Sequence, residues 1–145
     1  MTAVRNPSLE KQEVFVDATA WIAIADASET HHTDAIRIYA DLLHRRTYLV
    51  TIDLIIAEAQ IWIRRRINYQ AAMTFLERVN QSAQIEIIYL DASLEAETKA
   101  ILQQYANQDF SFADAAAFAL MRQRRITDAF TFDRHFITAG FLPLF

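Results

Sequence analysis

Two hydrophobic periodicities alternate along this chain of 145 residues. Runs rich in β-branched and aromatic residues, typical of buried strands, occupy residues 14–18, 48–52, 85–89 and 126–132. Apolar residues that recur every three or four positions, as in amphipathic helices, occupy residues 35–43, 53–66, 68–81, 93–105 and 112–125. Asp53, Asn68, Asp91 and Ser111 stand at the positions of helix N-caps.

The helical segments between successive strands predict a mostly parallel sheet, because parallel neighbours need long crossover connections. We therefore expect an α/β fold of three layers, α/β/α, with helices on both faces of the sheet. No repeat or linker divides the chain, so the expected organisation is a polar leader at residues 1–12 and one domain at residues 13–145. Ligands of such folds bind beyond the carboxyl ends of strands, where the strand order reverses.

The composition excludes several kinds of site. The chain has no cysteine, which excludes disulfide frameworks, cysteine-ligated metals and thiol nucleophiles. Its single glycine, Gly140, cannot form the Gly-rich phosphate loops of dinucleotide-binding or P-loop enzymes. A net charge of -4 excludes a surface that is basic throughout. No apolar run is long enough for a membrane span and the leader has no signal-peptide core, so we expect a soluble, cytoplasmic protein.

Four of the acidic residues lie in apolar surroundings. Asp17 ends the first predicted strand and Asp133 ends the last, whereas Glu58 and Asp114 lie in the opening halves of helices that follow strands. All four can therefore project onto one edge of the sheet. Two carboxylates about 4 Å apart repel by roughly 4 kcal/mol at an effective dielectric constant of 20. A cluster of four would not remain ionised without cations.

The local sequence offers little positive charge to such a cluster, with Arg134 as the exception. Oxygen ligands without cysteine or paired histidines suit Mg²⁺ or Mn²⁺ rather than Zn²⁺. The hypothesis is that the four acids bind one or two such ions, which lower the pKa of a water that attacks a phosphodiester.

Each acid also has a purely structural interpretation. Asp114 can complete a capping box with Ser111, Glu58 can reach solvent along its helix, and Asp133 can begin a turn. His31 and His32 are interpreted as a solvated loop that enters a helix, and His135 as an exposed turn residue.

Two groups of arginines also allow two interpretations: contact with an RNA backbone, or stabilisation of helix carboxyl ends. These arginines are Arg64, Arg65, Arg66, Arg122, Arg124 and Arg125.

Four short motifs carry a family resemblance: V-D-A-T at residues 16–19, T-I-D-L-I-I-A-E at 51–58, D-F-S-F-A-D at 109–114 and T-F-D-R-H-F at 131–136. In order and spacing they resemble the PIN-domain ribonucleases, specifically the VapC-type toxins of bacterial toxin–antitoxin pairs. The resemblance covers residues 14–145 and implies a PIN-like fold. It assigns Asp17, Glu58, Asp114 and Asp133 as the catalytic, metal-binding acids, whereas the acid at Asp109 is variable in the family.

The same resemblance implies that Thr19, Ser111, Thr131 and Arg134 support the ligands or contact substrate. The implied activity is Mg²⁺- or Mn²⁺-dependent endoribonuclease cleavage of RNA. The implied partners are an RNA substrate, a cognate antitoxin and a second copy in a homodimer, with no membrane.

Two rival functions remain at this stage. One is an aspartate-nucleophile phosphatase, which would need a second acid where Thr19 stands and a lysine that neither Lys11 nor Lys99 is placed to supply. The other is a catalytically silent PIN-like module that binds RNA or a partner; loss of one or more acids would indicate it, and all four are present.

Overall fold

A five-stranded parallel sheet forms the centre of the molecule in the computed structural model, which describes residues 12–145. The predicted leader lies outside the described residues apart from Gln12. The strands are β1 (Glu13–Val16), β2 (Tyr48–Ile52), β3 (Ile85–Ile88), β4 (Asp128–Phe130) and β5 (Leu142–Pro143). Their order is β3-β2-β1-β4-β5, and every neighbouring pair is parallel.

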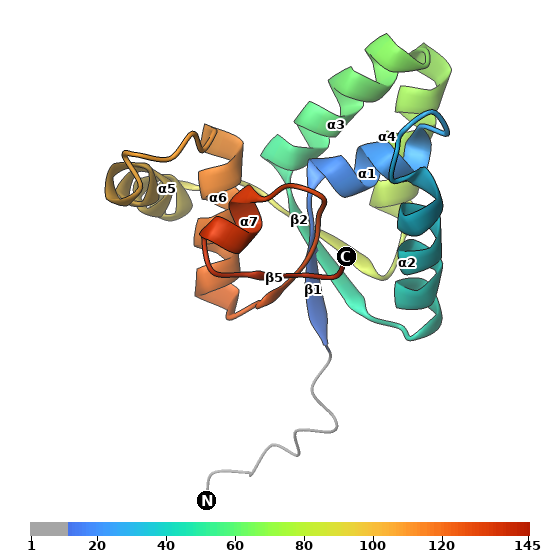
Figure 1. Cartoon of the computed structure of the whole chain (residues 1–145). Coiled ribbons are helices and arrows are strands. Elements are labelled where there is room, and N and C mark those ends of the chain that lie inside the picture. Colours follow the sequence, from blue (N-terminus) through green and yellow to red (C-terminus); the bar gives the residue numbers. More distant parts are fainter. Residues whose placement is uncertain (1–11) are drawn as a thin grey trace, which may run out of the picture.

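Seven helices cover the sheet in the part of the chain that the structure describes: α1 (Ala18–Ala25), α2 (His32–His44), α3 (Asp53–Arg66), α4 (Tyr69–Gln81), α5 (Ala92–Gln104), α6 (Phe112–Arg124) and α7 (His135–Thr138). Figure 1 shows α1, α2 and α4 on one side of the sheet and α5 and α6 on the other. The predicted three-layer α/β/α architecture is therefore confirmed. None of the helices among the described residues is long and apolar enough to cross a membrane.

The strand order reverses between β1 and β4. From β1 the chain proceeds outward through β2 to β3, and then returns through α5 and α6 to place β4 on the other side of β1. Right-handed crossovers put the two sets of helices on opposite faces. Val16 pairs with Phe130, and the Asp17 amide donates to the Phe130 carbonyl at 3.0 Å. Residues directly after β1 and β4 are thus neighbours at the carboxyl edge of the sheet, where the strand order reverses. We call this place the switch point.

The core around this point is dense and aromatic. Residues 114–121 of α6 are all buried, and four of them are alanines, which allow the helix to approach the sheet closely. Phe136 of α7 is fully buried and packs against Phe118 of α6, with ring centroids 4.9 Å apart. It also lies 6.1 Å from the ring of Phe15 in β1. The short α7 is therefore fixed against both the sheet and α6.

Most predicted element boundaries are correct within two residues, and the exceptions have local causes. Asn68, Asp91 and Ser111 cap their helices as predicted. The prediction for Asp53 is wrong: Ile52 remains extended in the sheet, and the Asp53 carboxylate accepts from the Leu54 and Leu90 amides instead.

The last predicted strand is shorter than residues 126–132. β4 stops at Phe130, since the Phe132 amide donates to the Thr19 hydroxyl and the Asp133 amide to the Thr131 hydroxyl. β5 and α7 were not predicted; with two and four residues, they are too short to show a periodicity.

The interpretation of His31 and His32 as a loop that enters a helix is correct, but neither side chain is fully solvated. His32 begins α2, and its Nδ1 lies 2.7 Å from the Ala23 carbonyl oxygen. The His31 ring stacks in parallel on Phe132 with centroids 4.5 Å apart, and both rings meet Phe145 edge-on. These ring contacts join the loop between α1 and α2 to the segment after β4.

Arg124 connects two strands of the sheet, β1 and β3. Its guanidinium lies 2.7 Å from the Glu13 carboxylate and 3.0 Å from that of Glu86, and its side chain is 27% exposed. The hydrogen bond from Arg124 lowers the pKa of Glu86. Arg124 follows Asp114 by ten residues on α6, about 15 Å along the helix axis. These contacts favour a structural role for Arg124 at the helix end, rather than contact with a ligand at the switch point.

We expect Arg124→Met to lower the free energy of unfolding by about 1–3 kcal/mol at pH 7, because two partly buried carboxylates lose their counter-charge. Because the folded-state pKa of Glu86 is lowered, the contribution is present above its ordinary value of 4.5 and fades as pH falls through the folded-state pKa. Chemical unfolding across pH 3–7 measures both effects. The exposed pair of Arg45 and Asp41 supplies a control, Arg45→Met, which should change stability far less. Equal losses in the two variants would contradict this role for Arg124.

Candidate active site

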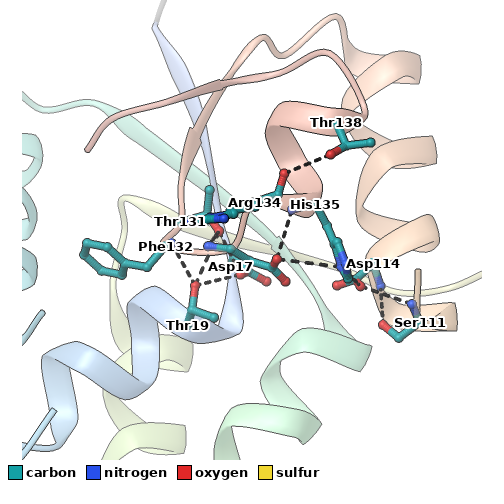
Figure 2. Close-up of polar contacts among 10 residues, drawn as sticks. Asp17, Thr19, Ser111, Asp114, Thr131, Phe132, Arg134, His135 and Thr138 are labelled. Atoms are coloured by element: carbon teal, nitrogen blue, oxygen red, sulfur yellow. Dashed lines mark hydrogen bonds and ion pairs between the residues drawn. The ribbon is translucent and has the colours of Figure 1, made fainter. Parts of the chain in front are cut away.

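Asp17 is the buried centre of a hydrogen-bond network at the switch point. It is only 3% exposed, and it directly follows β1 as the N-cap residue of α1. The hydroxyls of Thr19 and Thr131 donate to the same oxygen, Asp17 Oδ2, at 2.8 and 2.9 Å. Figure 2 shows both hydroxyls converging on this carboxylate, Thr19 from the first turn of α1 and Thr131 from the segment after β4.

Backbone amides orient these two hydroxyls. The Phe132 amide donates to Thr19 Oγ1 and the Asp133 amide to Thr131 Oγ1, each at 3.0 Å. Since each oxygen accepts one hydrogen bond, its own proton remains free to point at Asp17. The support predicted for Thr19 and Thr131 thus takes the form of donors that fix one oxygen of Asp17.

Asp114 opens α6 and is both a capping residue and a member of the site. The Ser111 hydroxyl accepts from the Asp114 amide at 3.0 Å, and Asp114 Oδ2 accepts from the Ser111 amide at 3.1 Å, which completes a capping box. The same Oδ2 lies 3.1 Å from Nδ1 of His135. The structural interpretation of Asp114 is therefore correct, and it does not remove the residue from the site.

Asp133 and His135 complete a compact group with Asp114. Asp133 Oδ1 accepts from the His135 amide at 2.9 Å and lies 3.7 Å from His135 Nδ1. Ligand atoms of Asp114, Asp133 and His135 all lie within 4.8 Å of one another. An acidic cluster able to bind a metal ion is therefore present.

The interpretation of His135 as a solvated turn residue is wrong. His135 begins α7, its side chain is 32% exposed, and its ring meets that of Phe110 edge-on at 5.1 Å. Desolvation lowers the pKa of this imidazole, but the hydrogen bond with Asp114 and the charges of Asp133, Asp114 and Asp109 outweigh it and raise the pKa.

Glu58 faces the same cluster from α3. The residue is exposed on the helix surface, yet its carboxyl group is sufficiently desolvated to raise its pKa, and the charges of Asp114 and Asp133 raise it further. Because neighbouring Ile55 and Ala59 are fully buried, the helix is held against the core at this point. Glu58 lies outside the 4.8 Å group but is coupled to it through these charges.

The cluster carries negative charge that His135 compensates only in part. Burial raises the pKa of Asp17 to about 6 despite the hydrogen bonds from the two threonines, and the charge of Asp114 contributes to the increase. Among residues 12–145, no lysine or arginine lies within ion-pair distance of Asp17, Glu58, Asp114 or Asp133. Their donor set of carboxylate oxygens fits a hard divalent cation.

The remaining predicted residues are less closely connected with the cluster. Arg134 is exposed and precedes α7, where its carbonyl accepts from the Thr138 hydroxyl. Asp109 is exposed and acts on His135 through its charge. Lys99, which a phosphatase mechanism would need, pairs with Glu95 at 3.0 Å on an exposed part of α5, and Lys11 lies outside the described residues.

Two more of the predicted arginines stack on aromatic rings. The Arg64 guanidinium lies 5.0 Å from the ring centre of Tyr69, and that of Arg66 lies 4.7 Å from the ring centre of Trp62. Both arginines belong to the last turn of α3. These contacts favour a role at the helix end over the binding of RNA near the acids.

Comparison with known proteins places these features in a family. The PIN-domain family matches residues 14–142. The 23S rRNA-specific endonuclease VapC20 of Mycobacterium tuberculosis, in strains CDC 1551 and H37Rv, is 29% identical over 131 residues, which are 90% of this chain and 97% of the relative.

Solved structures agree with the sequence comparison. The crystal structure of M. tuberculosis VapC20, described as a sarcin–ricin loop cleaving toxin, matches with a TM-score of 0.82 at 28% identity and covers 89% of this chain and 96% of VapC20. VapBC2 of Rickettsia felis, solved with a promoter DNA fragment, matches with a TM-score of 0.67 at 12% identity. It covers 91% of this chain and 97% of that structure, and it shows the fold alone.

The family match, the VapC20 relative and the parallel sheet together confirm the predicted resemblance, and they support a hydrolase that acts on RNA. Since the match includes the segments that carry Asp17, Glu58, Asp114 and Asp133, the chain belongs to the PIN-domain family.

Proposed function

We propose that this protein is a divalent-metal-dependent endoribonuclease and the toxin of a VapBC-type toxin–antitoxin pair. The observation that carries the proposal is the group of four carboxylates at the switch point, which have no lysine or arginine counter-charge among the described residues. The name of the VapC20 relative supports the reaction class and makes 23S rRNA the first substrate to test.

The need for a cation follows from the charges. Two ionised carboxylates about 4 Å apart repel by roughly 4 kcal/mol at an effective dielectric constant of 20, and the repulsion falls with distance. His135 offsets this only in part, because it can carry a single positive charge. A bound Mg²⁺ or Mn²⁺ would neutralise the cluster, lower the pKa of a water and stabilise charge on a phosphoryl group.

We assign each residue of the site a role according to its position. In the proposal, Asp17, Glu58, Asp114 and Asp133 bind the ion. Thr19 and Thr131 fix the orientation of Asp17, as their hydrogen bonds indicate. Ser111 does the same for Asp114 through the capping box. Exposed Arg134, next to Asp133, is available for the phosphate backbone of the substrate.

The partners follow from the toxin assignment. RNA is the substrate, a cognate antitoxin is the inhibitor, and we propose a homodimer as the assembled form in the cytoplasm. A catalytically silent module is the alternative, but a module kept for binding alone would not need all four carboxylates in one charged cluster.

The test is hydrolysis of 23S rRNA by the purified protein, with Asp114→Asn as the critical variant. We expect cleavage with Mg²⁺ or Mn²⁺, none with excess chelator, and a loss of more than about a hundredfold in Asp114→Asn, since a ligand to the ion contributes several kcal/mol to transition-state stabilisation.

Glu97→Gln is the matched control. Glu97 is exposed on α5, so this substitution removes one negative charge, as Asp114→Asn does, but outside the cluster. It should retain wild-type activity. Cleavage that survives chelation, or that Asp114→Asn retains, would contradict the proposal.

The raised pKa of Asp17 generates a second prediction. Since the folded state holds the pKa at about 6 and the ordinary value is 3.8, the metal-free protein should lose stability as pH rises from 3.8 to 6. In Asp17→Asn this loss disappears, so the variant should be more stable than wild type at pH 7 in chelator, by at most about 3 kcal/mol.

Urea unfolding at several pH values between about 3 and 7 measures the difference. Below the ordinary value both proteins carry a neutral side chain at this position, so their stabilities should converge there. An Asp17→Asn variant that is less stable than wild type at pH 7 without metal would show that the buried charge is already compensated.

A further inference from the structure

We propose that His135 is a nitrogen ligand of the divalent ion in this active site, alongside the carboxylates of Asp114 and Asp133. The inference rests on the proposed function, because it adds a ligand to the metal site assigned there. It also predicts a property that oxygen ligands alone would not confer: a preference for first-row transition-metal ions over Mg²⁺.

The distances fit a shared ion. In an octahedral complex with bonds of about 2.1 Å, adjacent donor atoms lie about 3 Å apart and opposite donors about 4 Å apart. His135 Nδ1 lies 3.1 Å from Asp114 Oδ2 and 3.7 Å from Asp133 Oδ1. Both values fall within this range, and the donor atoms of all three residues lie within 4.8 Å of one another.

The imidazole is also held in place by contacts other than those to the carboxylates. The ring meets Phe110 edge-on at 5.1 Å, and the His135 amide donates to Asp133 Oδ1 at 2.9 Å. The next residue, Phe136, is fully buried against α6 and β1. Figure 2 shows the His135 ring directed toward Asp114. Little movement of the ring is needed for Nδ1 to bind an ion, and the proton that Nδ1 shares with Asp114 Oδ2 is released to solvent when the ion binds.

The chemical consequence is selectivity among ions. Mg²⁺ prefers oxygen ligands and retains its waters, whereas imidazole nitrogen is an established ligand of transition metals. A site with one nitrogen and several carboxylate oxygens should therefore bind Mn²⁺ more tightly than Mg²⁺. The competing explanation is that His135 only hydrogen-bonds to Asp114 and never contacts the ion.

Pulsed electron paramagnetic resonance of the Mn²⁺-loaded protein distinguishes the two, because a directly bound imidazole nitrogen couples to the electron spin of Mn²⁺. We expect this ¹⁴N coupling in wild type and its loss in His135→Gln. Calorimetric titration should show that the variant binds Mn²⁺ about tenfold to a hundredfold more weakly. Its affinity for Mg²⁺ should change by less than about threefold. His44→Gln is the matched control, because His44 is exposed at the end of α2 and should leave both measurements unchanged.

The outcomes separate this inference from the proposed function. Mn²⁺ that binds to wild type without nitrogen coupling, or equal weakening of Mg²⁺ and Mn²⁺ in His135→Gln, would overturn the assignment of His135 and leave the nuclease proposal intact. Failure of wild type to bind either ion would contradict the proposed function itself. The wild-type spectrum decides the question even if the variant folds poorly.

Discussion

Repulsion among carboxylates at the switch point is the constraint on which the rest of this structure depends. Three acids follow or face the carboxyl ends of adjacent strands, and a fourth approaches from the start of α3. Burial raises the pKa of Asp17 to about 6, which means that the ionised side chain is less stable in this position than in water. A bound cation would stabilise the ionised form of such a cluster.

The fold itself brings these acids to one edge of the sheet. Val16 and Phe130 are partners in the sheet, so the residues that follow them are adjacent. The buried alanines of α6 bring Asp114 to the same edge, and the packing of Phe136 fixes His135 beside it. The aromatic core and the capping box therefore act on function indirectly, because they determine the positions of the charged atoms.

Hydrophobic periodicity predicts much of the fold, because four of the strands and the longer helices bury a regular apolar face. The position of Asp17 at the carboxyl edge of the sheet was predictable, since it directly follows an apolar strand, and Asp133 lies three residues beyond the end of β4. Asp114 illustrates a limit: the S-x-x-D pattern predicts a cap, and the structure shows one oxygen shared between the cap and the cluster. A local pattern cannot show that a residue has two roles.

His135 could not be found in the same way. Its contact with Asp114 spans 21 residues and depends on a helix of four residues, which is too short to produce a periodic signal. The misplaced cap at Asp53 has a related cause, because the pairing of Ile52 with Ile88 in the sheet, rather than local propensity, decides where α3 begins. Tertiary contacts overrode the local pattern at both positions.

The central claim is that the clustered carboxylates share a divalent ion. The most direct measurement is anomalous X-ray diffraction from crystals of the protein grown with Mn²⁺. The account predicts an anomalous peak within bonding distance, about 2.2 Å, of carboxylate oxygens of both Asp114 and Asp133. Density that shows no ion between these residues at saturating Mn²⁺, with their carboxylates neutralised by other side chains, would contradict it.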